Sequence, residues 1–317
     1  MNAVAKNGGP YIGRFAPSPS GPLHFGSLVA ALASYLDAKA HGGMWRVRIE
    51  DVDETRCNSA YAEDILRTLT VFGLNWDGEV VTQSLRKPAY EQAMARLSSA
   101  SRQPLTYLCR CSRKEIADST MGAGVGLEGP IYPGTCRARV NTAVVSDEEI
   151  GLATRVLTRS EPICFTDRVQ GEICQVLDTA IGDFVVKRRD GLFAYQLAAV
   201  VDDHALGVTD IVRGADLLDS TARQIHLQQL LGYTTPSYLH IPVAVNPLGQ
   251  KLSKQTLAPA ITAADAISHL QAALDFLGQT RPLDAPATPS LLLKHATSHW
   301  QPAAIPQSRD GVAPTSG

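Results

Sequence analysis

The chain has 317 residues, of which 44% are hydrophobic and 19% are charged, and its formal net charge at pH 7 is −2. These values are ordinary for a globular chain of two or three domains. The charge excludes a histone-like polycation but leaves room for a nucleic-acid partner on a local basic face. No window approaches 18 uninterrupted apolar residues, and the first ten residues have no apolar core, so we expect neither a membrane span nor a secretory signal.

The first hundred residues alternate between strand-like and helix-like runs. The expected elements are, in chain order, a strand at 11–16, a helix at 26–40, a strand at 44–49 and helices at 59–72 and 89–100. Strands that alternate with helices predict βαβ units, so we expect an α/β fold built on a parallel sheet.

This rhythm breaks at about residue 102 and returns near residue 181. The irregular segment between them, rich in glycine and proline, predicts an inserted module with short strands near 163–167 and 172–177. The later elements expected are strands at 182–187, 211–213 and 238–245, helices at 217–231 and 264–277, a further element at 195–201 and a last short helix ending at Trp300. Residues 301–317 are expected to form a disordered tail.

A turn-rich segment joins the first strand to the first helix. It reads RFAPSPSGPLHFGS from Arg14 to Ser27, and the free N–H groups and positive dipole end of the helix would attract phosphates. Gly26 would let a nucleotide approach the backbone closely, and His24 could donate a hydrogen bond to an oxygen that gains charge. Taken alone, His24 is better explained as a capping or core histidine.

A second segment with phosphate-binding chemistry follows a predicted turn at 246–249. The string Lys251-Leu252-Ser253-Lys254-Gln255 carries two ammonium groups that could bracket a triphosphate and stabilise a leaving pyrophosphate. In isolation, such a string is better explained as a solvated loop.

An acidic loop leaves the second predicted strand and reads RIEDVDETR from Arg48 to Arg56. Open parallel sheets bind ligands at the carboxyl ends of their strands. A carboxylate in this loop could therefore hold the ammonium group of an amino acid, and an acidic loop facing solvent is the alternative.

Three of the six cysteines, Cys109, Cys111 and Cys136, lie within 28 residues. Three thiolates and a fourth donor would satisfy tetrahedral zinc, and buried free thiols are the alternative. A histidine is not expected to be that donor, because none lies between His41 and His204.

The surroundings of this cluster are basic. A phosphate-facing patch or a solvated face would account equally well for the flanking cations, Arg110, Arg113, Lys114, Arg137 and Arg139. Because a chain without a secretion signal is not expected to carry disulfides, the remaining cysteines are expected to be buried thiols, namely Cys57, Cys164 and Cys174.

Together these segments resemble the signatures of the class I aminoacyl-tRNA synthetases. The run from Pro17 to Ser27 is similar to the region around the HIGH signature, and Lys251–Gln255 is similar to the KMSKS signature. The Arg-x-Glu-Asp-x-Asp-x-x-Arg pattern of the acidic loop is typical of the glutamyl and glutaminyl branch. Two positions depart from the signatures, since Ser27 replaces the second histidine of the first and Gln255 replaces the final serine of the second.

The resemblance implies a set of site residues. Glutamate would be held by Arg14, Ala16, Ser18, Glu50, Tyr195 and Arg213. ATP would be bound by His24, Gly26, Ser27, Lys251, Ser253 and Lys254, and the catalytic residues among these would be His24 and Lys254. One structural zinc ion per chain would be bound by Cys109, Cys111, Tyr132 and Cys136.

The resemblance also implies an architecture. A Rossmann-type parallel sheet would be formed by residues 10–101 and 181–245, an inserted zinc-containing, acceptor-type subdomain by 102–180, and a KMSKS-like loop with a mostly helical stem-contact region by 246–300. Only 62 residues follow Gln255, so we expect no anticodon-binding domain. The short length and the cysteine pattern make the chain similar to a truncated subfamily that transfers glutamate to queuosine in the anticodon of tRNA(Asp).

In that subfamily ATP, with Mg²⁺, activates glutamate as glutamyl-AMP, and a hydroxyl of queuosine at the wobble position then takes the glutamate. We therefore expect a cytoplasmic monomer that binds L-glutamate, ATP and the anticodon stem-loop of tRNA(Asp). The alternatives are a truncated glutamyl-tRNA synthetase that charges a tRNA 3′ end, a HIGH-type adenylate-forming ligase for small molecules, and a non-catalytic tRNA-binding module. The intact signatures argue against the last.

Overall fold

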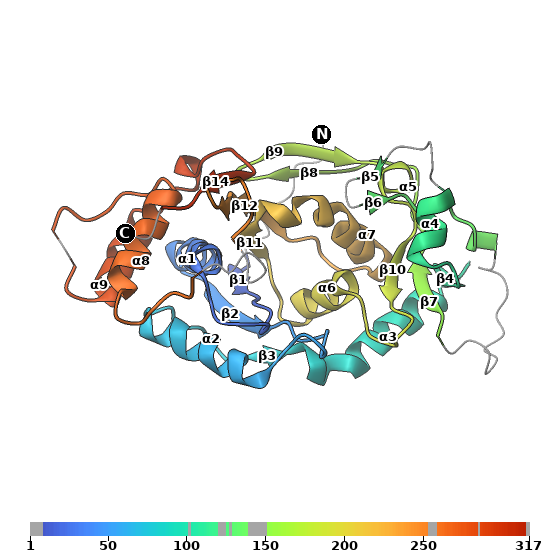
Figure 1. Ribbon diagram of the computed structural model, residues 1–317, viewed down its shortest axis with the longest axis horizontal. Helices are drawn as coiled ribbons and strands as arrows, with labels where there is room; N and C mark the ends of the chain where they lie inside the picture. Colours follow the sequence, from blue (N-terminus) through green and yellow to red (C-terminus); the bar gives the residue numbers. More distant parts are fainter. Residues whose placement is uncertain are drawn as a thin grey trace.

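The computed structural model describes residues 9–100, 103–119, 125–126, 129–138, 151–252, 259–284 and 286–314. Figure 1 shows an elongated molecule, with the C-terminal helices at one end and the segment that begins near residue 105 at the other. Within the ranges given above, no helix combines the length and the apolar character that a membrane crossing requires.

The first half of the parallel sheet contains the two strands that the sequence predicts and a short third strand that it does not. Strands β1 (Ile12–Phe15), β2 (Met44–Ile49) and β3 (Val81–Thr82) lie parallel in the order β1-β2-β3. The helices of this half are α1 (Phe25–Ala40), α2 (Ser59–Val71) and α3 (Lys87–Ser98). The strands expected at 11–16 and 44–49, and all three helices, are confirmed to within two residues.

A second sheet continues this layer. Its strands run in the order β11 (Asp210–Gly214), β12 (Ser237–Ile241), β8 (Ile163–Asp167) and β9 (Gly171–Gln175), and every pair is parallel except β8 with β9. β11 begins beside the start of β1, where the backbone N–H of Thr209 donates to the carbonyl of Ile12 at 2.9 Å. The carboxyl ends of β1, β2 and β11 therefore reach the same edge. Because β8 and β9 fall in the segment predicted as an insert, part of that segment extends the main sheet.

Two helices of the second half pack against α3 in a separate core. They are α6 (Tyr195–Ala205) and α7 (Thr221–Leu231), and the core between the three helices buries Tyr90, Leu197 and Leu227 completely. The helix expected at 217–231 is present from Thr221 onward, and its expected first residues belong to a 3₁₀ helix, Ala215–Ser220.

An antiparallel sheet lies at the far end of the molecule (Figure 1). Its strands are β10 (Phe184–Lys187), β7 (Ala153–Val156) and β4 (Thr106–Cys109), in that order. The small elements around it are α4 (Arg113–Ser119), α5 (Leu177–Ala180) and the two-residue strands β5 (Val125–Gly126) and β6 (Gly129–Pro130). A compact cluster of buried residues, centred on Cys109, Tyr132 and Cys136, is the core of this region.

The prediction of a disordered tail is wrong for residues 301–314. After helices α8 (Ala266–Phe276) and α9 (Pro289–Ser298), the strand β14 (Asp310–Val312) pairs in parallel with β13 (Val243–Val245). The side chain of Ile305 is buried in the main core. A three-residue edge strand has too few positions to show an alternating pattern, which is why the sequence gives no sign of it.

The prediction for Cys164 and Cys174 is also wrong. The two residues lie directly opposite each other on β8 and β9, both are exposed, and they form a disulfide with a Cα–Cα distance of 4.1 Å. Side chains at directly opposed positions of an antiparallel pair are within bonding reach, and only the register of the hairpin reveals this. Cys57 is half-buried, and its thiol lies near the backbone carbonyl of Glu50.

A fully buried carboxylate on α1 joins three distant parts of the chain. Asp37 accepts hydrogen bonds from the Tyr11 hydroxyl, from Arg168 Nη2 at 2.6 Å and from Trp300 Nε1 at 2.9 Å. Burial alone would raise its pKa, but the hydrogen bond and charge of Arg168 hold the pKa of Asp37 below its ordinary value. The ionised carboxylate therefore stabilises the folded chain at neutral pH.

Replacing this carboxylate by an amide should destabilise the protein. Because Arg168 would lose its buried partner, we expect Asp37→Asn to lower the free energy of unfolding by about 3 kcal/mol at pH 7. A group with a depressed folded-state pKa loses its contribution as the pH falls below the unfolded-state value, so the difference from wild type should shrink below about pH 4. Denaturant unfolding at pH 7 and at a pH well below 4 measures both effects, and equal stability of the two proteins at pH 7 would contradict the assignment.

Candidate active site

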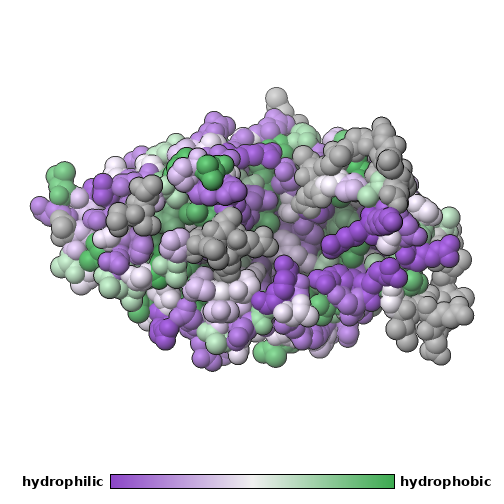
Figure 2. Space-filling model, in the orientation of Figure 1, coloured by the Kyte–Doolittle hydropathy of each residue, from purple (hydrophilic) through white to green (hydrophobic). Residues whose placement is uncertain are grey.

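Residues from both halves of the sheet meet at the edge where β1, β2 and β11 end. The segment after β1 leads into α1, the acidic loop follows β2, and α6 begins at Tyr195. This is the edge at which open parallel sheets bind ligands. Figure 2 shows this face of the molecule hollowed near its middle, with hydrophilic residues along part of the rim.

His24 lies at the N-terminus of α1, as the sequence predicts. Its Nδ1 accepts a hydrogen bond from the backbone N–H of Ser27 at 3.3 Å, and its Nε2 lies 3.2 Å from the Ser27 hydroxyl. The accepting role of Nδ1 leaves the proton of the neutral ring on Nε2. A Cβ added at Gly26 would come within 3.3 Å of the imidazole, so glycine leaves the ring room in this position.

The two ends of the lysine loop lie beside this helix start. Before the loop, the backbone N–H of Leu252 donates to the carbonyl of Ala244 at 2.8 Å; after it, Ala260 forms a β-bridge with His24. The Lys251 ammonium forms an ion pair with Asp216, which follows β11. Ser253 and Lys254 lie outside the described residues, so their assignment to ATP remains a prediction.

The predicted glutamate pocket contains a buried network of ion pairs. Arg48 lies between two carboxylates: its Nη2 donates to Glu50 Oε1 at 2.8 Å, and its Nη1 donates to Asp203. Arg14 Nε donates to the same oxygen of Asp203 at 3.1 Å. The side chain of Glu50 is only 10% exposed. Its charge is therefore poorly hydrated when the pocket is empty and can interact with a ligand that enters the pocket.

The charges that act on Tyr195 come from other residues of the predicted pocket. Burial raises the pKa of its hydroxyl, the charge of Glu50 raises it further, and the charges of Arg213, Arg14 and Arg48 oppose the rise. Burial likewise raises the pKa of Glu50, with Arg48 and Arg14 opposing it. Four residues predicted from separate segments, Arg14, Glu50, Tyr195 and Arg213, are thus brought together.

Arg213 is held deeply, with 5% of its surface exposed. Its Nε donates to His240 Nε2 at 3.0 Å and its Nη1 to Gln224 Oε1 at 2.8 Å. Its Nη2 donates to the Thr221 hydroxyl at 2.8 Å and to the Leu217 carbonyl at 3.3 Å. The guanidinium is therefore fixed in place before any substrate binds.

The loop that carries Ala16 and Ser18 lies against the acidic loop. The backbone N–H of Glu50 donates to the carbonyl of Pro17 at 2.9 Å. Ala16 is half-buried and Ser18 is exposed, and their assignment to glutamate remains a prediction.

Sequence reasoning did not assign Arg48 and Asp203 to the site. Arg48 is fully buried, and the charges of Arg48 and Arg14 hold the pKa of Asp203 below its ordinary value although burial would raise it. The available signal was a charged residue inside each of two apolar elements, Arg48 at the end of a strand and Asp203 within a helix of alanine and valine. A charged residue in such a run is expected to have a buried partner.

A cavity of about 260 Å³ opens beside the glutamate pocket. Val52 and Phe193 line it, and each is two residues away from a pocket residue, Glu50 or Tyr195. Two residues span at most about 7 Å, so the cavity and the glutamate pocket are neighbours. The cavity wall carries two lysines and two carboxylates, namely Lys87, Lys187, Glu91 and Asp190.

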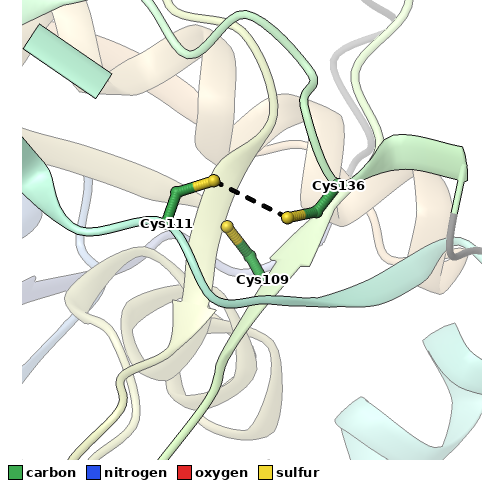
Figure 3. A group of neighbouring side chains, drawn as sticks. All are labelled: Cys109, Cys111 and Cys136. Carbon is green, nitrogen blue, oxygen red and sulfur yellow. Dashed lines mark hydrogen bonds between the residues drawn. The ribbon is translucent and has the colours of Figure 1, made fainter. Parts of the chain in front are cut away.

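The three clustered cysteines converge as the zinc hypothesis requires. The sulfur atoms of Cys109, Cys111 and Cys136 lie within 4.8 Å of one another and point toward a common centre (Figure 3). The Tyr132 hydroxyl is 3.5 Å from Cys109 Sγ and 4.0 Å from Cys111 Sγ, and it accepts the backbone N–H of Cys136 at 2.9 Å. Sulfurs of a tetrahedral zinc site are about 3.8 Å apart, so the donor set fits this ion.

The basic residues near the cysteines have different roles. Arg110, Arg113 and Lys114 are exposed, as a phosphate-facing patch requires. Arg137 instead donates to Asp183 and Asp178 at 2.8 and 3.0 Å, so it anchors the loop that carries Cys136. Arg139 lies outside the described residues.

Comparison with known proteins gives consistent results. The model of the family described as tRNA synthetases class I (E and Q), catalytic domain, matches residues 12–274. The chain is 52% identical to a glutamyl-Q tRNA(Asp) synthetase of Aromatoleum aromaticum, over 96% of this chain and 93% of the relative. It is 51% identical to a protein of the same name in Dechloromonas aromatica, over 94% and 96% respectively.

Among solved structures, a glutamate-tRNA synthetase of Elizabethkingia anophelis matches with a TM-score of 0.77 and 21% identity, over 97% of this chain and 68% of that one. A glutamate tRNA ligase of Elizabethkingia meningosepticum, solved with its amino acid, matches equally well, over 96% and 67%. These two matches support the α/β fold with a parallel sheet described above.

Proposed function

Because the chain belongs to the class I tRNA synthetases of the E and Q type, and within them to the group of relatives named glutamyl-Q tRNA(Asp) synthetase, we propose that it activates glutamate with ATP and transfers it to queuosine in tRNA(Asp). The observation that carries this proposal is the buried Arg48–Glu50 pair at the strand edge, in a chain about half of whose residues are identical to those of these relatives. The enzyme is accordingly a ligase that modifies tRNA.

Glutamate binds in the pocket between the two halves of the sheet. Glu50 receives the ammonium group, because a single arginine, Arg48, pairs with it, whereas Asp203 pairs with both Arg48 and Arg14. The positive charges of Arg14 and Arg213 and the Tyr195 hydroxyl suit the carboxylates. Ala16 and Ser18 lie at the entrance of this pocket, on the loop whose Pro17 carbonyl accepts the backbone N–H of Glu50.

ATP binds where the helix start and the lysine loop meet. The α-carboxylate of glutamate attacks the α-phosphorus, the bond to the β,γ-phosphates breaks, and pyrophosphate leaves. The Nε2–H of His24 and the first N–H groups of α1 stabilise the growing negative charge, with Gly26 and Ser27 beside them. Lys251, Ser253 and Lys254 bind the leaving group, and the Mg²⁺ that accompanies ATP supplies counter-charge.

Transfer needs a hydroxyl close to the activated carbonyl. A hydroxyl of the queuosine cyclopentenediol attacks it, and AMP leaves. We place the queuosine base at the cavity beside Glu50 and Tyr195, whose wall carries lysines and carboxylates alike.

The test is incorporation of labelled glutamate into bulk tRNA from cells with and without queuosine. We expect ATP-dependent labelling of the first pool alone. Equal labelling of both pools would indicate a truncated enzyme that charges 3′ ends, and pyrophosphate exchange without labelling of either pool would indicate a small-molecule ligase.

We further propose that Cys109, Cys111, Tyr132 and Cys136 bind one structural zinc ion. Support comes from the convergence of the donors and from the small size of the core around them, since a metal can stabilise a region that has little core. The guanidinium of Arg155, 3.7 Å from the centre of the Tyr132 ring, would balance part of the negative charge of the donors.

Removing one thiol should remove the metal. We expect Cys109→Ser to lose bound zinc and to lower the melting temperature, whereas Cys57→Ser, at a half-buried cysteine outside the cluster, should keep both. Metal analysis of protein purified under reducing conditions checks this. Wild-type protein without zinc, or zinc retained in full by Cys109→Ser, would refute the site.

A further inference from the structure

A buried polar network outside the proposed contacts lies behind Arg213. His240, on β12, accepts the Arg213 Nε–H at its Nε2 atom at 3.0 Å. The other ring nitrogen, Nδ1, lies 2.7 Å from Asp167 Oδ2 at the end of β8. The side chains of His240 and Asp167 are both 0% exposed, so solvent cannot replace either contact.

The hydrogen-bonding chemistry of Arg213, His240 and Asp167 permits one arrangement of protons. An arginine only donates, so His240 Nε2 must accept, and the ring proton must reside on Nδ1, where it is donated to Asp167. Asp167 is itself fixed, because its Oδ1 accepts backbone N–H groups from Val169 at 3.0 Å and Gln170 at 2.8 Å. Burial, together with the nearby charge of Arg213, lowers the pKa of His240 to about 4, so the ring is neutral at pH 7.

We propose that Asp167 and His240 are positioning residues that orient Arg213 for the side-chain carboxylate of glutamate. Asp167 selects the tautomer of His240, and His240 fixes the Nε edge of the guanidinium. Gln224 and Thr221 hold the other nitrogens, and among the described residues none accepts the second hydrogen of Nη1. The inference rests on the proposed function, since it takes the ligand of Arg213 to be glutamate.

Immobilising Arg213 in advance should favour glutamate binding, because an arginine side chain loses conformational entropy when a ligand fixes it. A guanidinium that is already fixed loses less of that entropy on binding, so the fixed contacts should contribute to glutamate affinity. The effect should appear in the KM for glutamate and not in the KM for ATP, whose proposed site at His24 and Lys251 uses none of these three residues. A purely structural His–Asp pair would instead affect folding or all kinetic parameters together.

The experiment is glutamate-dependent pyrophosphate exchange by full-length variants. His240→Leu removes the acceptor and should raise the KM for glutamate by about 10-fold or more, with the KM for ATP and kcat within about 2-fold of wild type. His240→Gln can place an amide oxygen near the position of Nε2 and should recover most of the loss. Asp167→Asn keeps the shape of the side chain, but its amide can donate to Nδ1 of His240. The ring proton would then move to Nε2, which faces Arg213. This variant should therefore also raise the KM for glutamate.

An unchanged KM for glutamate in folded His240→Leu would overturn the inference, and so would equal changes for glutamate and ATP. If His240→Leu does not fold, the same two results obtained with Asp167→Asn would overturn the inference. A wild-type protein without glutamate-dependent exchange would refute the proposed function itself, whereas exchange by wild type with an insensitive His240→Leu would refute only the positioning role.

Discussion

Glu50→Gln is expected to raise the KM for glutamate by about 100-fold in pyrophosphate exchange. The substitution keeps the size of the side chain, and Arg48 keeps Asp203 as its partner, so the fold should survive. What is lost is the negative charge that receives the substrate ammonium in a poorly hydrated pocket, and charged hydrogen bonds of this kind contribute about 1.5–3 kcal/mol.

A matched control lies in the same loop. Glu54 is 48% exposed and pairs with Lys87 at the surface, so Glu54→Gln should leave the KM for glutamate within about 2-fold of wild type. A KM for glutamate in Glu50→Gln that stays within about 3-fold of wild type would show that the ammonium is bound elsewhere.

The same carboxylate predicts a pH dependence. Because burial raises the pKa of Glu50, its carboxylate takes up a proton at a higher pH than an exposed glutamate does. The KM for glutamate should therefore rise as the pH falls through that raised value, and the rise should be absent in Glu50→Gln. Both profiles can be recorded in the same exchange assay.

His24→Ala is expected to lower the kcat of pyrophosphate exchange by about 10²–10³-fold, with little change in the KM for glutamate. The reason is that a donor aimed at charge developing on the phosphates acts mainly in the transition state. Stability should change little, because His24 is the N-cap of α1 and loss of a cap costs about 1 kcal/mol.

Ser27→Ala provides the control for His24. It removes the hydroxyl that lies 3.2 Å from the imidazole but keeps the ring and the backbone N–H bound to Nδ1. We expect a loss of kcat of only a few-fold. Equal losses in the two variants would mean that the Ser27 hydroxyl is as important as the ring, and a kcat of His24→Ala within 10-fold of wild type would exclude the proposed role.

Much of the site could be predicted because its chemistry is local in sequence. His24 and Gly26 belong to one turn between a strand and a helix, and Glu50 to one loop after a strand. The alternating pattern of strands and helices then indicated that these segments meet at one sheet edge, and in the structure β1 and β2 are parallel neighbours whose following loops are joined by the hydrogen bond from Glu50 to Pro17.

The partners that hold these residues could not be predicted, because they lie far away in sequence. Arg48 and Asp203 are 155 positions apart, and His240 and Asp167 are 73 apart. Their contacts depend on β11 lying beside β1 and on β8 lying beside β12, and β8 was placed in the insert by the sequence. The disulfide of the β8–β9 hairpin and the pairing of β14 with β13 were missed for the same reason, since register and neighbour choice are tertiary properties.

The measurement that tests the central claim most directly is the position of the transferred glutamate within the tRNA. Labelled glutamate, ATP and Mg²⁺ are incubated with queuosine-containing tRNA, which is then digested to nucleosides and analysed by mass spectrometry. We expect the label on the queuosine nucleoside of the anticodon and none on the 3′-terminal adenosine. Label on the terminal adenosine would contradict the proposed reaction and make the chain a charging enzyme.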